Sequence, residues 1–389
     1  MSMKIVFALD HIFLTKGKMV YSHTFFYEIL KRYITIFSEV TIVSRERKVD
    51  TIQGIPLASG EGVNFVFLQS ISSFYSYFGL RQHHEKKMQG ILKEHDALIV
   101  KLPSEFGMLA AKIAREQKKR YLAEVVGCAW DAMWNYGSMK AKLYAPYFFY
   151  SMKQCVREAD AVSYVTTRFL QQRYPVSKNA KTLGVSDVLL PKSSKTILDE
   201  RLTKIEIMED KKCIFATIAN LDMHYKGIDI ALQALSQLSK EDVDFEYHVV
   251  GDGDPSRYKI LAKKLGIENK VCFMGTLSSR DTLFKWLDKV DIYLQPSFLE
   301  GLPRAMIEAM SRGCPVIGSS VGGIPELLGK DMLFATKHPE KLLEIILTLV
   351  NNKALMGDQA KRNFIEVQKY QQSLLNQKRN NFWIEFRDG

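Results

Sequence analysis

The 389-residue sequence contains little cysteine and no long apolar run. The five cysteines lie far apart, at Cys128, Cys155, Cys213, Cys272 and Cys314. No pair has C-x-x-C spacing, which excludes the common zinc and dithiol redox motifs, and a dispersed odd set is typical of reduced thiols in a cytosol. The apolar-rich run at 143–152 is about half of the roughly 20 residues that a membrane-spanning helix needs. With no signal peptide expected before the short apolar run at 5–9, the sequence predicts a cytoplasmic protein that does not span a membrane.

Acidic residues are scarce in the first half of the chain. The whole chain has a net charge of +11. Residues 1–190 contain 26 Lys and Arg against 16 Asp and Glu, whereas the two signs are nearly balanced in the remainder, so almost all of the excess lies in the first half. A one-sided field of this kind indicates an anionic partner, such as a membrane surface, a nucleic acid or a phosphorylated acceptor. A simple solubility bias is the alternative. Because no segment resembles a nucleic-acid recognition motif, we expect no nucleic acid.

A peripheral contact with an anionic membrane surface would use lysines and aromatic residues of this basic half. The apolar contact is predicted at Phe74 to Phe78, and most of Tyr147 to Tyr150 is expected in the core. The candidate cations are Lys16, Lys18, Arg81, Lys86, Lys87, Lys140 and Lys142.

Strand-like and helix-like segments alternate in both halves, which predicts an α/β protein with two doubly wound parallel sheets, because one core rarely serves so long a chain. We predict a Rossmann-like N-terminal domain at 1–190, a charged linker at 191–212 and a second Rossmann-like domain at 213–370. A C-terminal helix at 371–389 is expected to pack back toward the N-terminal domain. In open sheets of this kind, ligands bind at the carboxyl ends of the strands.

The segment QPSFLEGLPRAMIEAMSRGCPVIGSSVGGIPELL, residues 295–328, contains two glutamates eight positions apart, Glu300 and Glu308. Pro303 suits the first turn of a helix, so Glu300 is placed in a strand-to-helix loop and Glu308 in the helix. The next strand leads to Gly322-Gly323, and Pro325 is expected to open another helix whose N-terminus favours an anion. Carboxylates beside an anion site indicate a ligand that is both phosphorylated and rich in hydroxyl groups, such as a nucleotide sugar.

This segment resembles the E-x₇-E signature of retaining glycosyltransferase family 4, which has the GT-B fold with two facing Rossmann-like domains. Lys226-Gly227, the VVGDGD stretch and Gly322-Gly323-x-x-Glu326 also match, mainly over residues 213–330. The resemblance is to enzymes that build bacterial surface polysaccharides and glycolipids.

The resemblance implies roles for individual residues. Glu308 would accept hydrogen bonds from the ribose hydroxyls, Glu300 would lie against the donor sugar, and Lys226 would neutralise the diphosphate. Lys226 and Glu300 are the catalytic candidates of this half. The remaining donor-binding residues implied are Asn220, Gly301, Leu302, Gly322, Gly323, Gly251 and Gly17. No cofactor and no metal are implied, so Asp252-Gly-Asp254 is interpreted as a turn rather than a metal motif.

The sequence also departs from the family pattern. Ala219-Asn220-Leu221 stands where the family often has Gly-Arg-Leu, so one cation is missing. Thr15-Lys16-Gly17-Lys18 replaces a Gly-Gly pair, and the histidine that often follows a central N-domain strand is absent. Asp131, placed with the catalytic candidates, and Glu124 are the polar residues left for contact with the acceptor or donor sugar.

The predicted function is transfer of a sugar from a nucleotide sugar, UDP-linked rather than GDP-linked, to a hydroxyl of a glycan or lipid-linked acceptor. Two alternatives stay open: a nucleotide-sugar epimerase of similar fold, and a noncatalytic membrane-bound carbohydrate-binding subunit.

Overall fold

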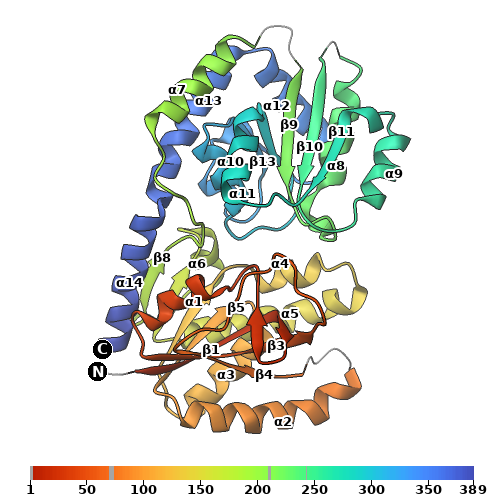
Figure 1. The fold of residues 1–389 in the computed structure, drawn as a ribbon. Helices are drawn as coiled ribbons and strands as arrows, with labels where there is room; N and C mark the ends of the chain where they lie inside the picture. The colour runs from red at the N-terminus through yellow and green to blue at the C-terminus, as the bar shows by residue number, and fades with distance from the viewer. Residues whose placement is uncertain (1–2, 70–73, 209–211, 242) are drawn as a thin grey trace. The chain divides into compact units, whose positions relative to one another are not determined.

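The computed structural model describes residues 3–69, 74–208, 212–241 and 243–389, without the side chains of residues 74–81. These residues form two compact units (Figure 1). Unit 1 comprises Met1–Trp134, Ser138–Val185 and Gln377–Gly389, and unit 2 comprises Asn135–Gly137 and Ser186–Asn376. Among the helices described, none has the length and apolar character needed to cross a bilayer.

Unit 1 is built on an eight-stranded sheet with the order β4-β3-β1-β5-β6-β7-β8, in which β2 pairs with β1. All pairs are parallel except the β1–β2 hairpin. The strands are β1 (Lys4–Lys16), β2 (Met19–Tyr21), β3 (Glu39–Lys48), β4 (Val63–Phe67), β5 (Ala97–Leu102), β6 (Tyr121–Val125), β7 (Ala161–Tyr164) and β8 (Lys181–Gly184).

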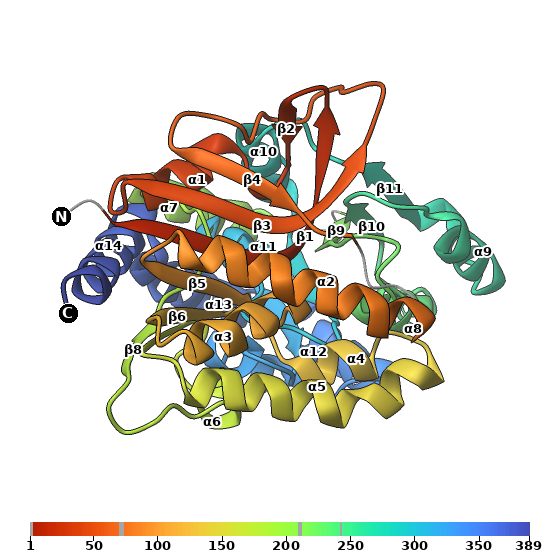
Figure 2. The same ribbon diagram turned by 90° about the horizontal axis from the view of Figure 1, so that it is seen from below.

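Helices cover both faces of this sheet. They are α1 (Tyr27–Ile34), α2 (Phe74–Lys93), α3 (Glu105–Glu116), α4 (Ala129–Trp134), α5 (Met139–Arg157) and α6 (Phe169–Arg173). Helices α2, α3 and α5 lie side by side in one layer, with α3 in contact with both neighbours (Figure 2). Helix α1 lies in the other layer, where Tyr33 stacks on Trp383 from the C-terminal part of the chain, with ring centroids 4.4 Å apart.

Unit 2 contains a six-stranded parallel sheet in the order β11-β10-β9-β12-β13-β14. Its strands are β9 (Cys213–Ile218), β10 (Phe245–Val250), β11 (Val271–Gly275), β12 (Ile292–Gln295), β13 (Val316–Ser319) and β14 (Leu333–Phe334). Apart from the hairpin strand β2, both sheets have the strand order of a Rossmann fold. In this order the first strands are added toward one edge, and the later strands are added toward the other edge, beside the first strand. The predicted fold class is therefore confirmed.

The helices of unit 2 are α7 (Lys195–Glu206), α8 (Ile228–Leu238), α9 (Ser256–Lys264), α10 (Arg280–Lys289), α11 (Arg304–Ser311), α12 (Pro339–Val350), α13 (Lys353–Glu366) and the start of α14 (Gln372–Asp388). Short 3₁₀ turns are η1 (His224–Lys226), η2 (Glu268–Lys270), η3 (Ile324–Glu326), η4 (Lys330–Met332) and η5 (Val367–Tyr370). Residues of α14 from Gln377 onward belong to unit 1.

Helix α7 occupies Lys195–Glu206, much of the linker predicted over residues 191–212, and it belongs to unit 2. Although the sequence of this helix is mostly polar, one of its charged side chains is buried and fixes the helix to unit 2. Arg201 is only 3% exposed, and its guanidinium donates hydrogen bonds to the carbonyl oxygens of Leu287 (2.8 Å) and Arg312 (3.1 Å). A charged side chain that is fully engaged in hydrogen bonds can be buried, so charge alone does not mark a linker.

Candidate active site

The candidate site lies in unit 2, at the carboxyl ends of the central strands β9 and β12, where the strand order reverses. The loops that follow β9, β10, β12 and β13 meet at this edge of the sheet. Leu221 N donates to Asp252 O (2.7 Å), and Phe298 N donates to Tyr225 O (2.7 Å), so the loops are joined by backbone hydrogen bonds. This is the edge at which open α/β sheets bind ligands.

Glycines allow these loops to approach one another. A side chain at Gly227 would collide with the backbone oxygen of Pro296, one at Gly251 with that of Ala219, and one at Gly322 with that of Glu300. Gly227 and Gly322 also have positive φ angles of 70° and 56°, which favour glycine. Loop packing therefore accounts for glycine at Gly251 and Gly322, which the sequence had assigned to donor binding.

The amide of Gly323, expected to face a phosphate, donates to Gly301 O at 2.7 Å instead. The helix expected to open at Pro325 is the three-residue 3₁₀ turn η3. A single turn aligns few peptide dipoles, so it provides much less of the anion-attracting field expected of a helix N-terminus. Leu302, another predicted donor-binding residue, has a buried side chain.

Lys226 and Glu300 form the central ion pair of the site. Lys226 Nζ lies 2.7 Å from Glu300 Oε1, and the two side chains are only 20% and 10% exposed. Glu300 Oε1 also accepts hydrogen bonds from Gln295 Nε2 (2.9 Å) and Ser297 Oγ (2.8 Å). The Lys226 ammonium has three donors, so the contact with Glu300 leaves two for another anion.

A buried polar network behind Glu300 was missed by the sequence analysis. Tyr293 Oη donates to Gln295 Oε1 (3.0 Å), and Gln295 Nε2 donates to Ser297 Oγ (2.8 Å). These residues alternate along β12 and into its loop, so they share one face of the strand. Polar residues at every second position of an otherwise apolar strand were the available signal.

Glu308 is half-buried in helix α11, and among the residues that the structure describes none donates a hydrogen bond to its carboxylate. Burial raises the pKa of Glu308, while Arg304 and Arg280 act in the opposite direction. Burial, together with the Glu300 and Glu308 carboxylates, also holds the pKa of Tyr293 well above its usual value. Both carboxylates therefore act on the same tyrosine hydroxyl, as expected if they border one site.

Asn220 and the two aspartates near it are engaged in turns. Asn220 Oδ1 accepts from Asp222 N (3.0 Å), and Asp222 Oδ1 accepts from Asp254 N (3.0 Å). Asp254 Oδ1 accepts from the backbone and hydroxyl of Ser256 at the start of α9 (2.9 and 2.6 Å). These bonds fit the interpretation of Asp252-Gly-Asp254 as a turn.

Comparison with known proteins assigns this chain to a family. The sequence profile described as "Glycosyl transferases group 1" matches residues 212–352. Protein CapJ from Staphylococcus aureus is 33% identical over 353 residues, which cover 90% of this chain and 86% of CapJ.

The chain belongs to the glycosyl transferase group 1 family.

Solved structures agree on the fold. Sucrose-phosphate synthase from Thermosynechococcus elongatus superposes with a TM-score of 0.70 at 16% identity, covering 98% of both chains. HepE from Anabaena in complex with UDP superposes with a TM-score of 0.66 at 16% identity, covering 97% of this chain and 99% of HepE. The protein is thus a glycosyltransferase of the GT-B fold, which confirms the predicted enzyme class.

In this glycosyltransferase, the polar candidates of unit 1 are engaged within that unit. Asp131 forms an ion pair with Arg173 (3.2 Å). Glu124 is buried on the central strand β6, and its carboxylate accepts hydrogen bonds from Tyr33 Oη (3.1 and 3.2 Å) and contacts Lys101 Nζ at 3.4 Å. The core already satisfies the Glu124 carboxylate, which argues against the predicted contact of this residue with a sugar.

Gly17 lies in the turn between β1 and β2 with a φ of 59°. No atom lies within 4 Å of a side chain that would be added at this glycine, so the turn requires glycine for its backbone angle rather than for space.

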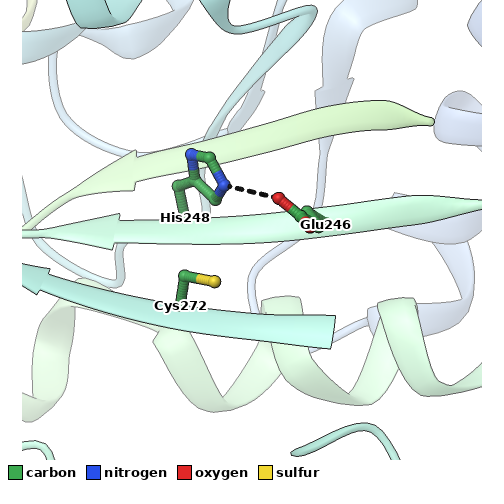
Figure 3. Close-up of side chains that lie close together, drawn as sticks. All are labelled: Glu246, His248 and Cys272. Carbon is green, nitrogen blue, oxygen red and sulfur yellow. Dashed lines mark hydrogen bonds and ion pairs between the residues drawn. The ribbon is translucent and has the colours of Figure 1, made fainter. Parts of the chain in front are cut away.

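One group of described residues has the composition of a metal site. Glu246, His248 and Cys272 place their ligand atoms within 4.8 Å of one another on the β10–β11 face (Figure 3). His248 and Cys272 are register partners, and His248 Nε2 lies 3.1 Å from Glu246 Oε2.

The surroundings of this group do not fit a metal ion. Lys212 Nζ occupies Glu246 Oε1 at 2.9 Å, and burial raises the pKa of the Cys272 thiol. Trp286 Nε1 donates to His248 Nδ1 (3.4 Å), which leaves the imidazole proton on Nε2, facing Glu246. A metal on Nε2 would move that proton to Nδ1, against the indole N–H. The group is better explained as a hydrogen-bonded cluster.

Proposed function

We propose that this glycosyltransferase transfers a sugar from a UDP-sugar to a hydroxyl group of a glycan or lipid-linked acceptor, with retention of anomeric configuration and without a metal. The reaction is assigned to the cytoplasm, where it would contribute to the synthesis of a surface polysaccharide or glycolipid.

The observation that carries the proposal is the Glu308 carboxylate. A half-buried carboxylate that accepts no hydrogen bond from the described residues costs free energy unless a ligand supplies donors. The two adjacent hydroxyls of a ribose supply two such donors and can bind both carboxylate oxygens. The raised pKa of Glu308 is the expected signature of this arrangement, because burial penalises the charge until the ligand is bound.

The Lys226–Glu300 pair supports the chemical step. The three hydrogen bonds to Glu300 converge on Oε1, which leaves Oε2 to accept a hydroxyl of the donor sugar. The Lys226 ammonium can then stabilise the charge that develops on the diphosphate as the bond between it and the sugar carbon breaks.

The acceptor hydroxyl forms the new bond to the same carbon from the side of the leaving group. Its proton passes to an oxygen of the departing phosphate, so the products are the glycosylated acceptor and UDP. No protein nucleophile is required, and the two glutamates do not form the acid–base pair of a glycosidase.

The relatives support the choice of substrates. HepE has been solved in complex with UDP and with UDP-glucose. The amylovoran biosynthesis glycosyltransferase AmsK of Erwinia amylovora is 34% identical over 139 residues, 33% of this chain and 34% of AmsK. The likeness to HepE favours a UDP-sugar donor, and the likeness to AmsK favours a role in polysaccharide biosynthesis.

A thermal-shift screen tests the donor assignment, since a ligand that binds only the native state raises the melting temperature. UDP should raise it more than GDP or ADP. Incubation of UDP-sugars with lipid-linked and glycan acceptors, followed by NMR of the product, then tests transfer and anomeric configuration. An inverted product would refute retention, conversion of the donor sugar without acceptor would indicate an epimerase, and binding without turnover would indicate a noncatalytic subunit.

A further inference from the structure

Helix α5 of unit 1 is apolar on two opposite sides. One side packs into unit 1 through a buried stripe that consists of Ala145, Phe148, Met152, Cys155 and Val156. The opposite side consists of Met139, Leu143, Tyr147 and Tyr150, at helical spacings of four, four and three. We call these four residues the outer stripe.

The outer stripe is exposed. Met139 is 72% exposed, Leu143 77%, Tyr147 51% and Tyr150 66%. Most of Tyr147 to Tyr150 was expected in the core, but of these four residues only Phe148 is buried, and Tyr147 and Tyr150 are at the surface. A surface helix normally turns its polar residues outward, so four large apolar and aromatic residues in one exposed row indicate a surface that binds something.

The charge around the outer stripe is of one sign. Lys140, Lys142, Lys153 and Arg157 are the charged residues of α5, and the segment 132–157 contains no Asp or Glu. The acids that flank the segment are neutralised within unit 1, because Asp131 pairs with Arg173 and Glu158 with Arg115. From the neighbouring helix α3, Glu105 accepts a hydrogen bond from Tyr144. The outer stripe is thus bordered by cations without a free acid on its own helix.

A groove beside the outer stripe extends the apolar surface. It lies between α3 and α5 and has a volume of about 260 Å³. Its apolar lining includes Met108, Leu109 and Tyr147, and its polar lining includes Glu105, Lys112, Arg115 and Gln154. Tyr147 belongs to both the stripe and the groove, so the two are continuous.

We infer that the outer stripe of α5 and its lysines dock this enzyme on an anionic phospholipid surface. Tyrosines place an apolar ring and a polar hydroxyl at the level of lipid headgroups, lysines bind anionic headgroups, and the groove admits part of an acyl chain. The inference extends the proposed function, since an enzyme held at this surface can reach a lipid-linked acceptor. The sequence analysis predicted the apolar contact at Phe74 to Phe78. Those side chains, like that of Arg81, lie outside the described residues, so that prediction is not tested.

The test is cosedimentation of the full chain with vesicles of phosphatidylcholine alone and of phosphatidylcholine mixed with phosphatidylglycerol, at low and high salt. One variant removes the outer stripe: Leu143→Ser, Tyr147→Ser and Tyr150→Ser. Another reverses charge: Lys140→Glu and Lys153→Glu. The matched controls carry the same kinds of change on exposed residues of α9 in unit 2, Ile260→Ser with Lys259→Glu and Lys263→Glu.

The wild-type chain and the α9 control should bind the anionic vesicles, and high salt should weaken that binding. Each α5 variant should bind them at least about tenfold more weakly. A UDP-induced thermal shift that is equal in all variants establishes that each is folded, and it reports on the proposed function separately. Loss of UDP binding with vesicle binding retained would refute the donor assignment and leave the docking surface standing.

Three results would overturn the inference. They are equal binding of the wild type to neutral and anionic vesicles, undiminished binding by both α5 variants, and absence of vesicle binding with a dimer that the stripe variant abolishes. The last result would assign the outer stripe to a second copy of the chain.

Discussion

Two largely buried lysine–glutamate pairs, one in each unit, differ in the residues that surround them. In unit 1, Lys101 and Glu124 are register partners on β5 and β6, and their side chains are 16% and 8% exposed. In unit 2, Lys226 and Glu300 are 20% and 10% exposed but lie on loops beyond the strand ends. Glu124 receives further hydrogen bonds from Tyr33 in the core, whereas the hydrogen bonds that Lys226, Gln295 and Ser297 donate to Glu300 all end on Oε1.

The comparison teaches that burial and charge do not identify a catalytic residue by themselves. The same residue types at similar exposure form a structural pair where they sit within the sheet, and a candidate binding site where they sit at the carboxyl edge of the strands. Position relative to the strand ends separates the two pairs.

Removing the two lysines separately should sharpen this contrast most strongly. Lys226→Ala should lower kcat/KM for transfer by about 10²–10³, as expected for the loss of a group that stabilises developing charge, with little change in uridine affinity. Lys101→Ala should leave transfer nearly intact. It should lower the free energy of unfolding of unit 1 by about 3 kcal/mol, because the buried Glu124 carboxylate loses its cationic partner. Steady-state kinetics and denaturant unfolding measure the two effects, and a reversed pattern would show that the two pairs were assigned to the wrong roles.

The next largest effect concerns the nucleotide. Glu308→Ala should weaken UDP binding by about 1.5–3 kcal/mol, the value of hydrogen bonds to a charged group. Calorimetry with UDP and with 2′,3′-dideoxy-UDP provides the control, since the dideoxy ligand should bind the wild type and the variant equally. Unchanged UDP affinity in the variant would exclude Glu308 as the ribose ligand.

Glu308 should have a smaller effect on the pH dependence of stability. Because burial raises the pKa of Glu308, the folded protein holds this proton more tightly than the unfolded chain does. Stability should therefore fall as the pH rises from the ordinary carboxyl pKa through the raised one. Glu308→Gln should make the ligand-free protein slightly more stable at neutral pH and no different near pH 4, as measured by urea unfolding. A variant that is less stable at neutral pH would contradict the assignment of an uncompensated carboxylate.

Chelation should have the smallest effect. Transfer should persist in excess EDTA, because Asp254 is engaged with Ser256 and the Glu246 cluster is closed by Lys212 and Trp286. Loss of activity that Mn²⁺ restores would move Asp252 and Asp254 into the catalytic site.

The sequence predicted unit 2 more fully than unit 1. Glu300, Lys226 and the glycines lie on a few short loops that parallel strands bring to one edge, so local pattern was enough to group them. The hydrogen-bonded row of Tyr293, Gln295 and Ser297 was missed, although its alternation could have been noticed.

In unit 1, whether a side chain is buried or exposed depends on partners that are distant in sequence. Glu124 is satisfied by Tyr33, 91 residues away, and Tyr147 and Tyr150 face outward because a second apolar stripe on the same helix faces inward. Aromatic composition does not reveal which of two apolar sides of a helix is buried. Similarly, the charged helix α7 belongs to unit 2 because Arg201 donates hydrogen bonds to the carbonyl oxygens of Leu287 and Arg312. These partners lie about 90 to 110 residues further along the chain.

The packing of α14 bears on the order in which the protein folds as it is synthesised. Trp383 is fully buried against Tyr33, and Arg120 donates to the carbonyl oxygen of Phe386 at 2.6 Å, so the last residues complete the core of unit 1. The segments of unit 1 up to Val185 are synthesised first and lack this part of their core until residues 377–389 have been made, whereas unit 2 has all of its own residues by Asn376. The unit whose synthesis begins first is therefore completed after unit 2, and a nascent chain stalled before Trp383 would contain every residue of unit 2 but an incomplete core of unit 1.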